Sequence, residues 1–224
     1  MSKAYLGDEL LYDSALLAPR TSLWLPGTTG NYASCPDSVS TSITGDFDIR
    51  WFGSLDDWTP AGTTTLVAKD SGSTQRSFMV VVLTSGVLRL YVSMNGSSVS
   101  SVDSTVAPTV TNGALLWIRV TRASATGATT FYTSINGTTW TQLGSTVSTT
   151  SGSPYDSTQP LSIGSYDGSS WLLKGRTLKA EVRNGINGTV VASPDFTAPK
   201  SSRFLDAQDN LWTINGSAWA WEKA

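Results

Sequence analysis

The sequence contains no histidine, one cysteine and few charged side chains. Charged residues make up 14% of its 224 residues, well below the quarter that is usual in globular domains. Without histidine the chain can build neither a Ser-His-Asp nor a Cys-His nucleophile, and it lacks the commonest ligand of transition metals. A single cysteine, Cys35, excludes an internal disulfide framework, and we expect it to be a small, semi-buried side chain.

The charge balance and hydropathy exclude two further classes of partner. The formal net charge is −2, and no run of Lys and Arg forms a footprint for phosphates, so we expect no binding to nucleic acid. No apolar run approaches the ~20 residues of a membrane span, which predicts no membrane insertion. At the amino end, Asp8, Glu9 and Asp13 interrupt any apolar core, so we expect no secretory signal peptide.

Turn residues and short β-prone runs make up most of the chain. Asn-Gly pairs favour two-residue hairpin turns of type I′, because both residues tolerate positive φ. Between the turns lie alternating or continuously apolar runs, and helical periodicity is missing over any useful length. We therefore predict an all-β fold of two stacked antiparallel sheets. The expected strands are 46–51, 77–83, 87–92, 115–121, 161–164, 177–183, 211–214 and a hairpin over 130–143 around Asn136-Gly137, and a closing hairpin would end at 218–221.

Several segments occur in an order that resembles a known superfamily. They include Trp-Ile-Arg-Val at 117–120, Asn-Gly-Thr-Thr-Trp at 136–140 and Leu-Ser-Ile-Gly-Ser at 161–165, with further matches at 25–27, 31–38, 43–50, 56–60 and 65–69. Together they resemble the concanavalin A-like lectin/glucanase superfamily (laminin-G/pentraxin-like), as found in minor tail and fibre proteins of bacteriophages that infect actinobacteria. The resemblance covers about Arg20 to Trp221 and implies a jelly-roll sandwich over residues 20–224.

The same resemblance implies a place on a virion. We expect a minor tail or fibre protein that is made in the host cytoplasm and binds host cell-surface carbohydrate, or alternatively a purely structural decoration protein. Residues 1–19 would form an arm that docks onto other virion proteins, because their apolar side chains suit burial against a partner, and a homo-oligomer would be typical of such assemblies. The docking side chains would be Tyr5, Leu6, Leu10, Leu11 and Tyr12.

Some members of this superfamily hydrolyse polysaccharides, which needs two carboxylates across the scissile bond. Those members carry a Glu-x-Asp-x-Glu strand motif, and none of Glu9, Glu181 and Glu222 lies in such a pattern. Asp46 and Asp48 share one face of an expected strand, but the corresponding position is structural in the family. We therefore predict a binding protein and not an enzyme.

Aromatic side chains are the candidates for a saccharide site. There are nine tryptophans, and we expect most of them in the core, including Trp51, Trp117, Trp212 and Trp219. Four aromatic residues in or beside predicted loops could instead be exposed and stack on sugar rings, with packing as their alternative role: Trp58, Tyr155, Tyr166 and Trp171.

A cofactor is not required by any of these patterns. Lectin-like sandwiches often bind calcium through loop carboxylates, and the loop residues that could contribute are Asp103, Asp156 and Asp167. The sequence does not single out a set of ligands.

Overall fold

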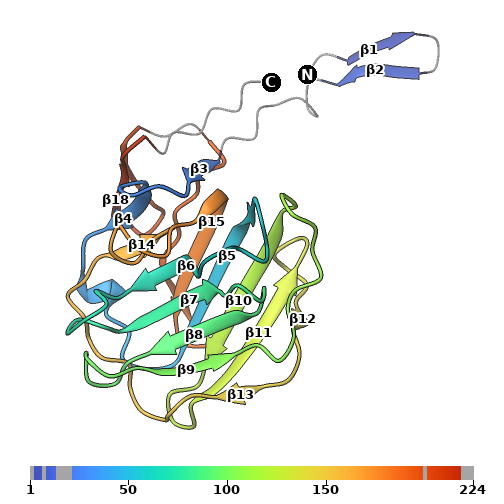
Figure 1. The fold of residues 1–224 in the computed structure, drawn as a ribbon. Helices are drawn as coiled ribbons and strands as arrows, with labels where there is room; N and C mark the ends of the chain where they lie inside the picture. Colours follow the sequence, from blue (N-terminus) through green and yellow to red (C-terminus); the bar gives the residue numbers. More distant parts are fainter. Residues whose placement is uncertain (1–2, 7–8, 14–21, 199–200, 218–224) are drawn as a thin grey trace.

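The computed structural model describes residues 3–6, 9–13, 22–198 and 201–217. Over these residues it contains strands, turns and one short 3₁₀ helix, η1 (Val39–Thr41), and no α-helix. Two eight-stranded sheets stack face to face, and every strand pair in them is antiparallel (Figure 1). The predicted all-β sandwich is confirmed.

The first sheet, called sheet I, contains the long central strands. Its strand order is β12-β11-β10-β5-β15-β16, with β13 added beside β11 and β3 beside β15. The strands are β3 (Leu23–Pro26), β5 (Phe47–Leu55), β10 (Leu116–Arg122), β11 (Ala128–Ser134), β12 (Thr141–Gln142), β13 (Val147–Ser148), β15 (Lys174–Asn184) and β16 (Thr189–Ala192).

The second sheet, called sheet II, has the strand order β17-β18-β4-β14-β6-β7-β8-β9. The strands β6, β7, β8 and β9 run as a meander across β5, β10 and β11 of sheet I (Figure 1). The bounds are β4 (Tyr32–Cys35), β6 (Thr64–Lys69), β7 (Phe78–Val82), β8 (Leu88–Val92), β9 (Ser100–Asp103), β14 (Leu161–Ile163), β17 (Arg203–Leu205) and β18 (Leu211–Asn215).

A separate two-stranded hairpin lies in the amino-terminal segment. Strands β1 (Lys3–Leu6) and β2 (Glu9–Asp13) pair antiparallel. The five residues expected to dock, Tyr5, Leu6, Leu10, Leu11 and Tyr12, belong to these two strands, and docking through them stays a prediction. Trp219 and the second half of the expected closing hairpin lie outside the described residues, whereas β18 pairs with β17 and β4.

The core fills the space between the sheets with side chains from alternate strand positions. Trp51 and Trp212 are fully buried, as predicted. The indole of Trp51 donates a 2.9 Å hydrogen bond to Thr177 Oγ1, which satisfies its one polar group. Cys35 is also fully buried, and burial is the main cause that raises its thiol pKa to about 12, so it is an inert packing residue.

Trp117 is not in the core, which corrects the prediction. Its neighbours Leu116 and Ile118 face the core, so Trp117 must point to the outer face of sheet I, because successive strand residues alternate. There it is half-buried and stacks on Phe52, with ring centroids 4.7 Å apart and planes at 10°.

The Asn-Gly pairs do mark turns, but the predicted turn type is wrong. A type I′ turn needs positive φ at both residues. Among the described residues Asn187 is the one asparagine of these pairs with positive φ; in the other five pairs only the glycine has it. The asparagine side chain instead accepts backbone N–H groups ahead of it, as Asn136 Oδ1 does from Thr138 and Thr139, both at 2.9 Å.

This turn recurs as a six-residue sequence, Ser-x-Asn/Asp-Gly-Ser/Thr-Ser/Thr, at 93–98, 134–139 and 165–170. In each copy the hydroxyl of the first serine accepts the N–H of the glycine, at 3.0, 3.0 and 2.9 Å. The six-residue sequence therefore determines the turn locally. Its third copy, at 165–170, directly precedes Trp171 of the candidate site.

Candidate functional site

The candidate site begins with a rigid turn in the connection between β14 and β15. Asp167 Oδ1 accepts the N–H groups of Ser169 and Ser170 at 2.8 and 2.6 Å, and Ser165 Oγ donates to the carbonyl of Ser170 at 2.9 Å. Burial alone would raise the pKa of Asp167, but these hydrogen bonds hold it below its usual value. The ionised carboxylate therefore keeps the turn closed at neutral pH.

Trp171 follows this turn directly and has an unusual backbone conformation. Its φ is +50°, a region that bulky side chains rarely adopt and that is found where surrounding structure enforces it. The carbonyl of Trp171 accepts the N–H of Thr65 on β6 at 2.8 Å. This bond ties the loop to β6, an inner strand of sheet II.

Three aromatic rings meet on the outer face of sheet II, and we call them the aromatic platform: Tyr91, Tyr166 and Trp171. The indole of Trp171 lies 5.3 Å from the ring of Tyr166 and 5.7 Å from that of Tyr91. All three side chains are half-buried, so each keeps part of its surface open to solvent. They rest on an apolar floor formed by Ala68, Met79 and Val81.

An ion pair fixes the far end of the platform. Arg89 Nη2 lies 2.8 Å from Asp103 Oδ2 across the β8–β9 ladder, and Arg89 Nη1 donates to the hydroxyl of Tyr91 at 3.1 Å. The hydrogen bonds to Asp103 and Tyr91 raise the pKa of Arg89. The guanidinium also lies 5.5 Å from the Tyr91 ring centroid, so the ring is held by both contacts.

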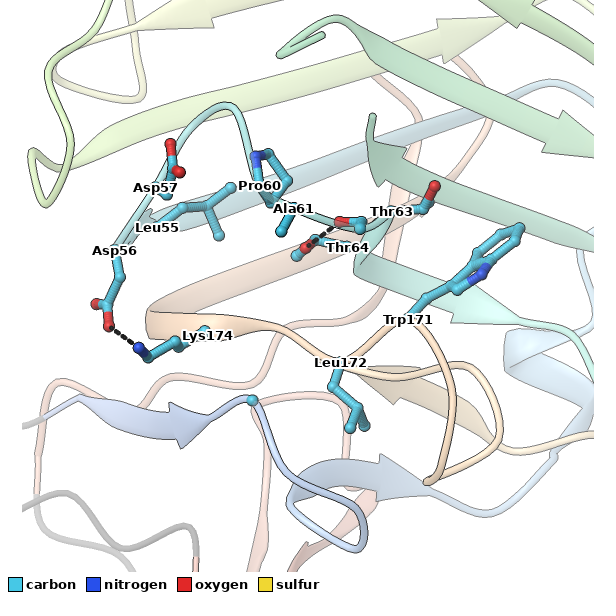
Figure 2. Close-up of a pocket in the computed structure, with 12 residues that line it drawn as sticks. Leu55, Asp56, Asp57, Pro60, Ala61, Thr63, Thr64, Trp171, Leu172 and Lys174 are labelled. Atoms are coloured by element: carbon cyan, nitrogen blue, oxygen red, sulfur yellow. Dashed lines mark hydrogen bonds and ion pairs between the residues drawn. The ribbon is translucent and has the colours of Figure 1, made fainter. Parts of the chain in front are cut away.

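Trp171 also lines a pocket of about 690 Å³. Figure 2 shows Trp171 at one end and the pair Asp56–Lys174 at the other, with the segment 60–64 forming a wall. Lys174 Nζ lies 3.8 Å from Asp56 Oδ2. The pocket therefore offers one aromatic ring, backbone and hydroxyl groups, and charges of both signs, and it lies within the size range of ligand sites.

Asp57 adds a fixed negative charge to the pocket lining. Its Oδ1 accepts the backbone N–H of Thr59 at 2.8 Å and the amide of Asn112 at 3.2 Å. The N–H of Thr59 is the main cause that lowers the pKa of Asp57. The carboxylate is thus an acceptor at neutral pH and is unsuited to donating a proton.

The structure brings together two of the four predicted site residues. Tyr166 and Trp171 belong to the platform, whereas Tyr155 lies elsewhere, with its ring against Gly96 and its N–H on the carbonyl of Ser93. Trp58 is only 4% exposed and packs edge-on against Trp51 in the core, so its prediction as an exposed ligand residue is wrong.

Sequence reasoning missed Tyr91, although a signal was present. The strand Leu88–Val92 alternates, with leucine and valine at its inward positions. Alternation alone places Arg89 and Tyr91 together on the opposite face, where an aromatic residue has no core to fill.

The carboxylates considered for catalysis and for calcium have other partners. Asp48 is fully buried between Arg50 and Arg119, and Asp46 accepts the N–H of Ser124 at 2.7 Å. Over the described residues, no group of three or more acidic or cysteine side chains could hold a metal ion. Asp103 is paired with Arg89 and Asp167 closes its turn, so calcium binding stays a prediction. No helix in the described part of the chain could span a membrane.

Comparisons with known proteins support the fold. No family model matches the chain, and no curated protein matches its sequence. The native heptameric SAP-like pentraxin from Limulus polyphemus is 14% identical over 74% of this chain and 77% of its own, with a TM-score of 0.52. Domains LG4-5 of the mouse laminin α1 chain are 15% identical, with a TM-score of 0.53, over 85% of this chain and 47% of theirs.

A third similar structure is the full extracellular region of zebrafish Gpr126/Adgrg6. It is 13% identical, with a TM-score of 0.55, over 92% of this chain and 26% of its own length. The chain thus spans less than half of the laminin and zebrafish molecules that it matches. At such identities the likeness concerns the fold alone. Two stacked antiparallel sheets and these neighbours show that the chain has an all-β jelly-roll fold similar to that of these pentraxin and laminin domains.

Proposed function

We propose that this domain binds carbohydrate without chemically changing it. The observation that carries the proposal is the continuity of the aromatic platform with the pocket through Trp171, which belongs to both. A sugar ring presents C–H faces that stack on aromatic rings, and hydroxyls at its rim that need hydrogen-bond partners. The platform supplies the first kind of contact, and the pocket supplies the second through Asp56, Asp57 and Lys174.

The ionised state of Asp57 favours a binding role for this carboxylate over an acid role in hydrolysis. Glycoside cleavage needs a carboxylic acid with a raised pKa and a second carboxylate across the bond. In the pocket, the pKa of Asp57 is lowered. The chain has no histidine to act instead. These features suit recognition of hydroxyl groups by permanent acceptors.

The biological setting that we propose is the tail or fibre of a bacteriophage, with the saccharide on the host cell surface. This proposal rests on the sequence segments that resemble such proteins. The hairpin β1–β2 would then contact other virion proteins, and the domain could function as a homo-oligomer. A structural decoration role without a ligand is the competing proposal, and the binding experiment below separates the two.

The test compares saccharide binding by the wild-type domain and Trp171→Ala. Immobilised polysaccharides and purified bacterial cell walls should retain the wild-type protein, and the substitution should weaken binding at least about tenfold, because a central stacking ring is lost. Ile135→Ala is the control, since Ile135 is 89% exposed and not part of the site. Failure of the wild-type protein to bind any saccharide, or unchanged binding by a folded Trp171→Ala, would contradict the proposal.

A further inference from the structure

The pocket beside Trp171 adjoins a second one. Asp56 lines both the first pocket and another of about 370 Å³ on the outer face of sheet I. The walls of the second pocket come from β5, β15 and the segment before β10, and include Ser54, Leu115, Arg176 and Leu178. The two hollows therefore meet at the end of the sandwich where β5 leaves sheet I.

The residues between the two pockets are open to solvent. The side chains of Asp56 and Lys174 are 51% and 68% exposed, and their charged atoms are 3.8 Å apart. An exposed pair at this separation contributes little to stability. Its carboxylate and ammonium groups can therefore bind hydroxyls of a ligand that passes from one pocket to the other.

An exposed tryptophan stands beside the second pocket. Trp24 on β3 is 41% exposed, which makes it the most exposed tryptophan in the described part of the chain. In the register of the sheet it lies opposite Arg176, which lies opposite Ser54 on its other side. Paired residues of antiparallel strands share a face, so Trp24, Arg176 and Ser54 form a row across the outer face of sheet I.

We propose that the ligand is an extended polysaccharide chain bound along its interior, with Trp171 and Trp24 as two separate stacking positions. The path runs from the aromatic platform through the first pocket, over Asp56 and Lys174, into the second pocket beside Trp24. This inference rests on the proposed function. A terminal monosaccharide would fill one pocket, whereas both pockets lie in the size range of ligand sites and share a residue.

The test measures how affinity depends on chain length. The panel contains glucans, chitin-type chains, galactan and mannan, and the best binder is cut into size-fractionated fragments from disaccharides to decasaccharides for calorimetry. Wild-type affinity should rise with length until the fragment reaches the second pocket. Trp24→Ala should weaken binding of the longest fragments at least about tenfold while leaving binding of the shortest ones unchanged, and Trp171→Ala should weaken both.

Two controls keep the outcome interpretable. Trp24→Phe should restore most of the affinity for long fragments, and Leu205→Ala alters an exposed apolar side chain that lines neither of the two pockets. Length-independent affinity, with Trp24→Ala behaving as wild type and Trp171→Ala weakened, would overturn the extended path and leave carbohydrate binding intact. No binding of any panel member would overturn both proposals.

Discussion

Aromatic side chains cover different kinds of residue on the outer faces of the two sheets. On sheet I, Asp48 is fully buried and lies 2.9 Å from Arg50 and 2.8 Å from Arg119. The ring of Trp140 covers both arginines, with the guanidinium carbons 5.4 and 5.6 Å from its centroid. The aromatic ring here closes over an ion cluster and separates it from water.

On sheet II the aromatic rings cover apolar side chains and remain beside an open pocket. Tyr91, Tyr166 and Trp171 lie over alanine, methionine and valine, and the neighbouring ion pair Arg89–Asp103 stays partly exposed. A buried carboxylate needs shielding and paired donors, whereas an apolar floor needs only coverage. The difference indicates that Trp140 serves stability by covering the Asp48 cluster, whereas the rings of the aromatic platform keep part of their surface open to solvent.

Asp48→Ala should have the largest effect on stability. It leaves Arg50 and Arg119 close together without their shared carboxylate, and removing one partner of a buried ion pair costs about 3–5 kcal/mol. Urea unfolding measures the loss. Asp156→Ala is the matched control, since Asp156 is exposed and its loss should change stability by less than about 0.5 kcal/mol. Equal urea midpoints for the two variants would contradict the stabilising role of the buried Asp48 cluster.

A tryptophan from each face gives a second comparison. Trp140→Ala should lower the free energy of unfolding by about 2 kcal/mol, because it removes the ring over Arg50 and Arg119 and its edge contact with Trp117. It should leave saccharide affinity unchanged. Trp171→Ala should do the reverse, with a small change in stability and a loss of affinity. Unfolding and binding assays on both proteins decide this, and loss of affinity in a folded Trp140→Ala would show that the ligand also contacts the Asp48 cluster.

The strands were predictable because their signal is local. The continuous apolar run at 77–83 became β7, whose residues are all buried, and the alternating run at 87–92 became β8. Each pattern depends on residues within one strand. The Asn136-Gly137 hairpin also follows from local turn chemistry, although its connection between Ser134 and Thr141 is longer than two residues.

The site was only half predictable, because it is made by contacts between distant segments. Nothing near Trp58 in the sequence reveals that its ring meets Trp51 in the core. Likewise Tyr91 and Trp171 are neighbours only because the loop after β14 bonds to Thr65 on β6. Asp48 looks like a solvent-facing position of an alternating strand, and its burial depends on arginines from β5 and β10 and on a ring that lies beyond β11.

Two buried aspartates should respond to acid in opposite directions, which is the smallest effect that we predict. Burial would raise the pKa of Asp48, but hydrogen bonds from Arg50 and Arg119 lower it overall. Its stabilising contribution is therefore present above the unfolded-state pKa of about 3.9 and is lost as the pH falls through its lower folded-state pKa.

Asp70 lies at the turn after β6 and accepts a hydrogen bond from the N–H of Gly72. Gly72 in turn lies against the ring of Tyr166, so Asp70 is close to the platform. Burial raises its pKa, and the N–H of Gly72 and the single guanidinium of Arg76 offset this only in part. As the pH falls, Asp70 therefore takes up a proton in the folded state before it does so in the unfolded state. Its contribution to the free energy of unfolding increases between its raised folded-state pKa and the unfolded-state pKa of about 3.9. Urea midpoints between about pH 3 and pH 7 test this. Asp70→Asn should remove the gain on acidification and Asp48→Asn should remove the loss, so profiles that shift in the same direction for both variants would refute the assignment of opposite environments.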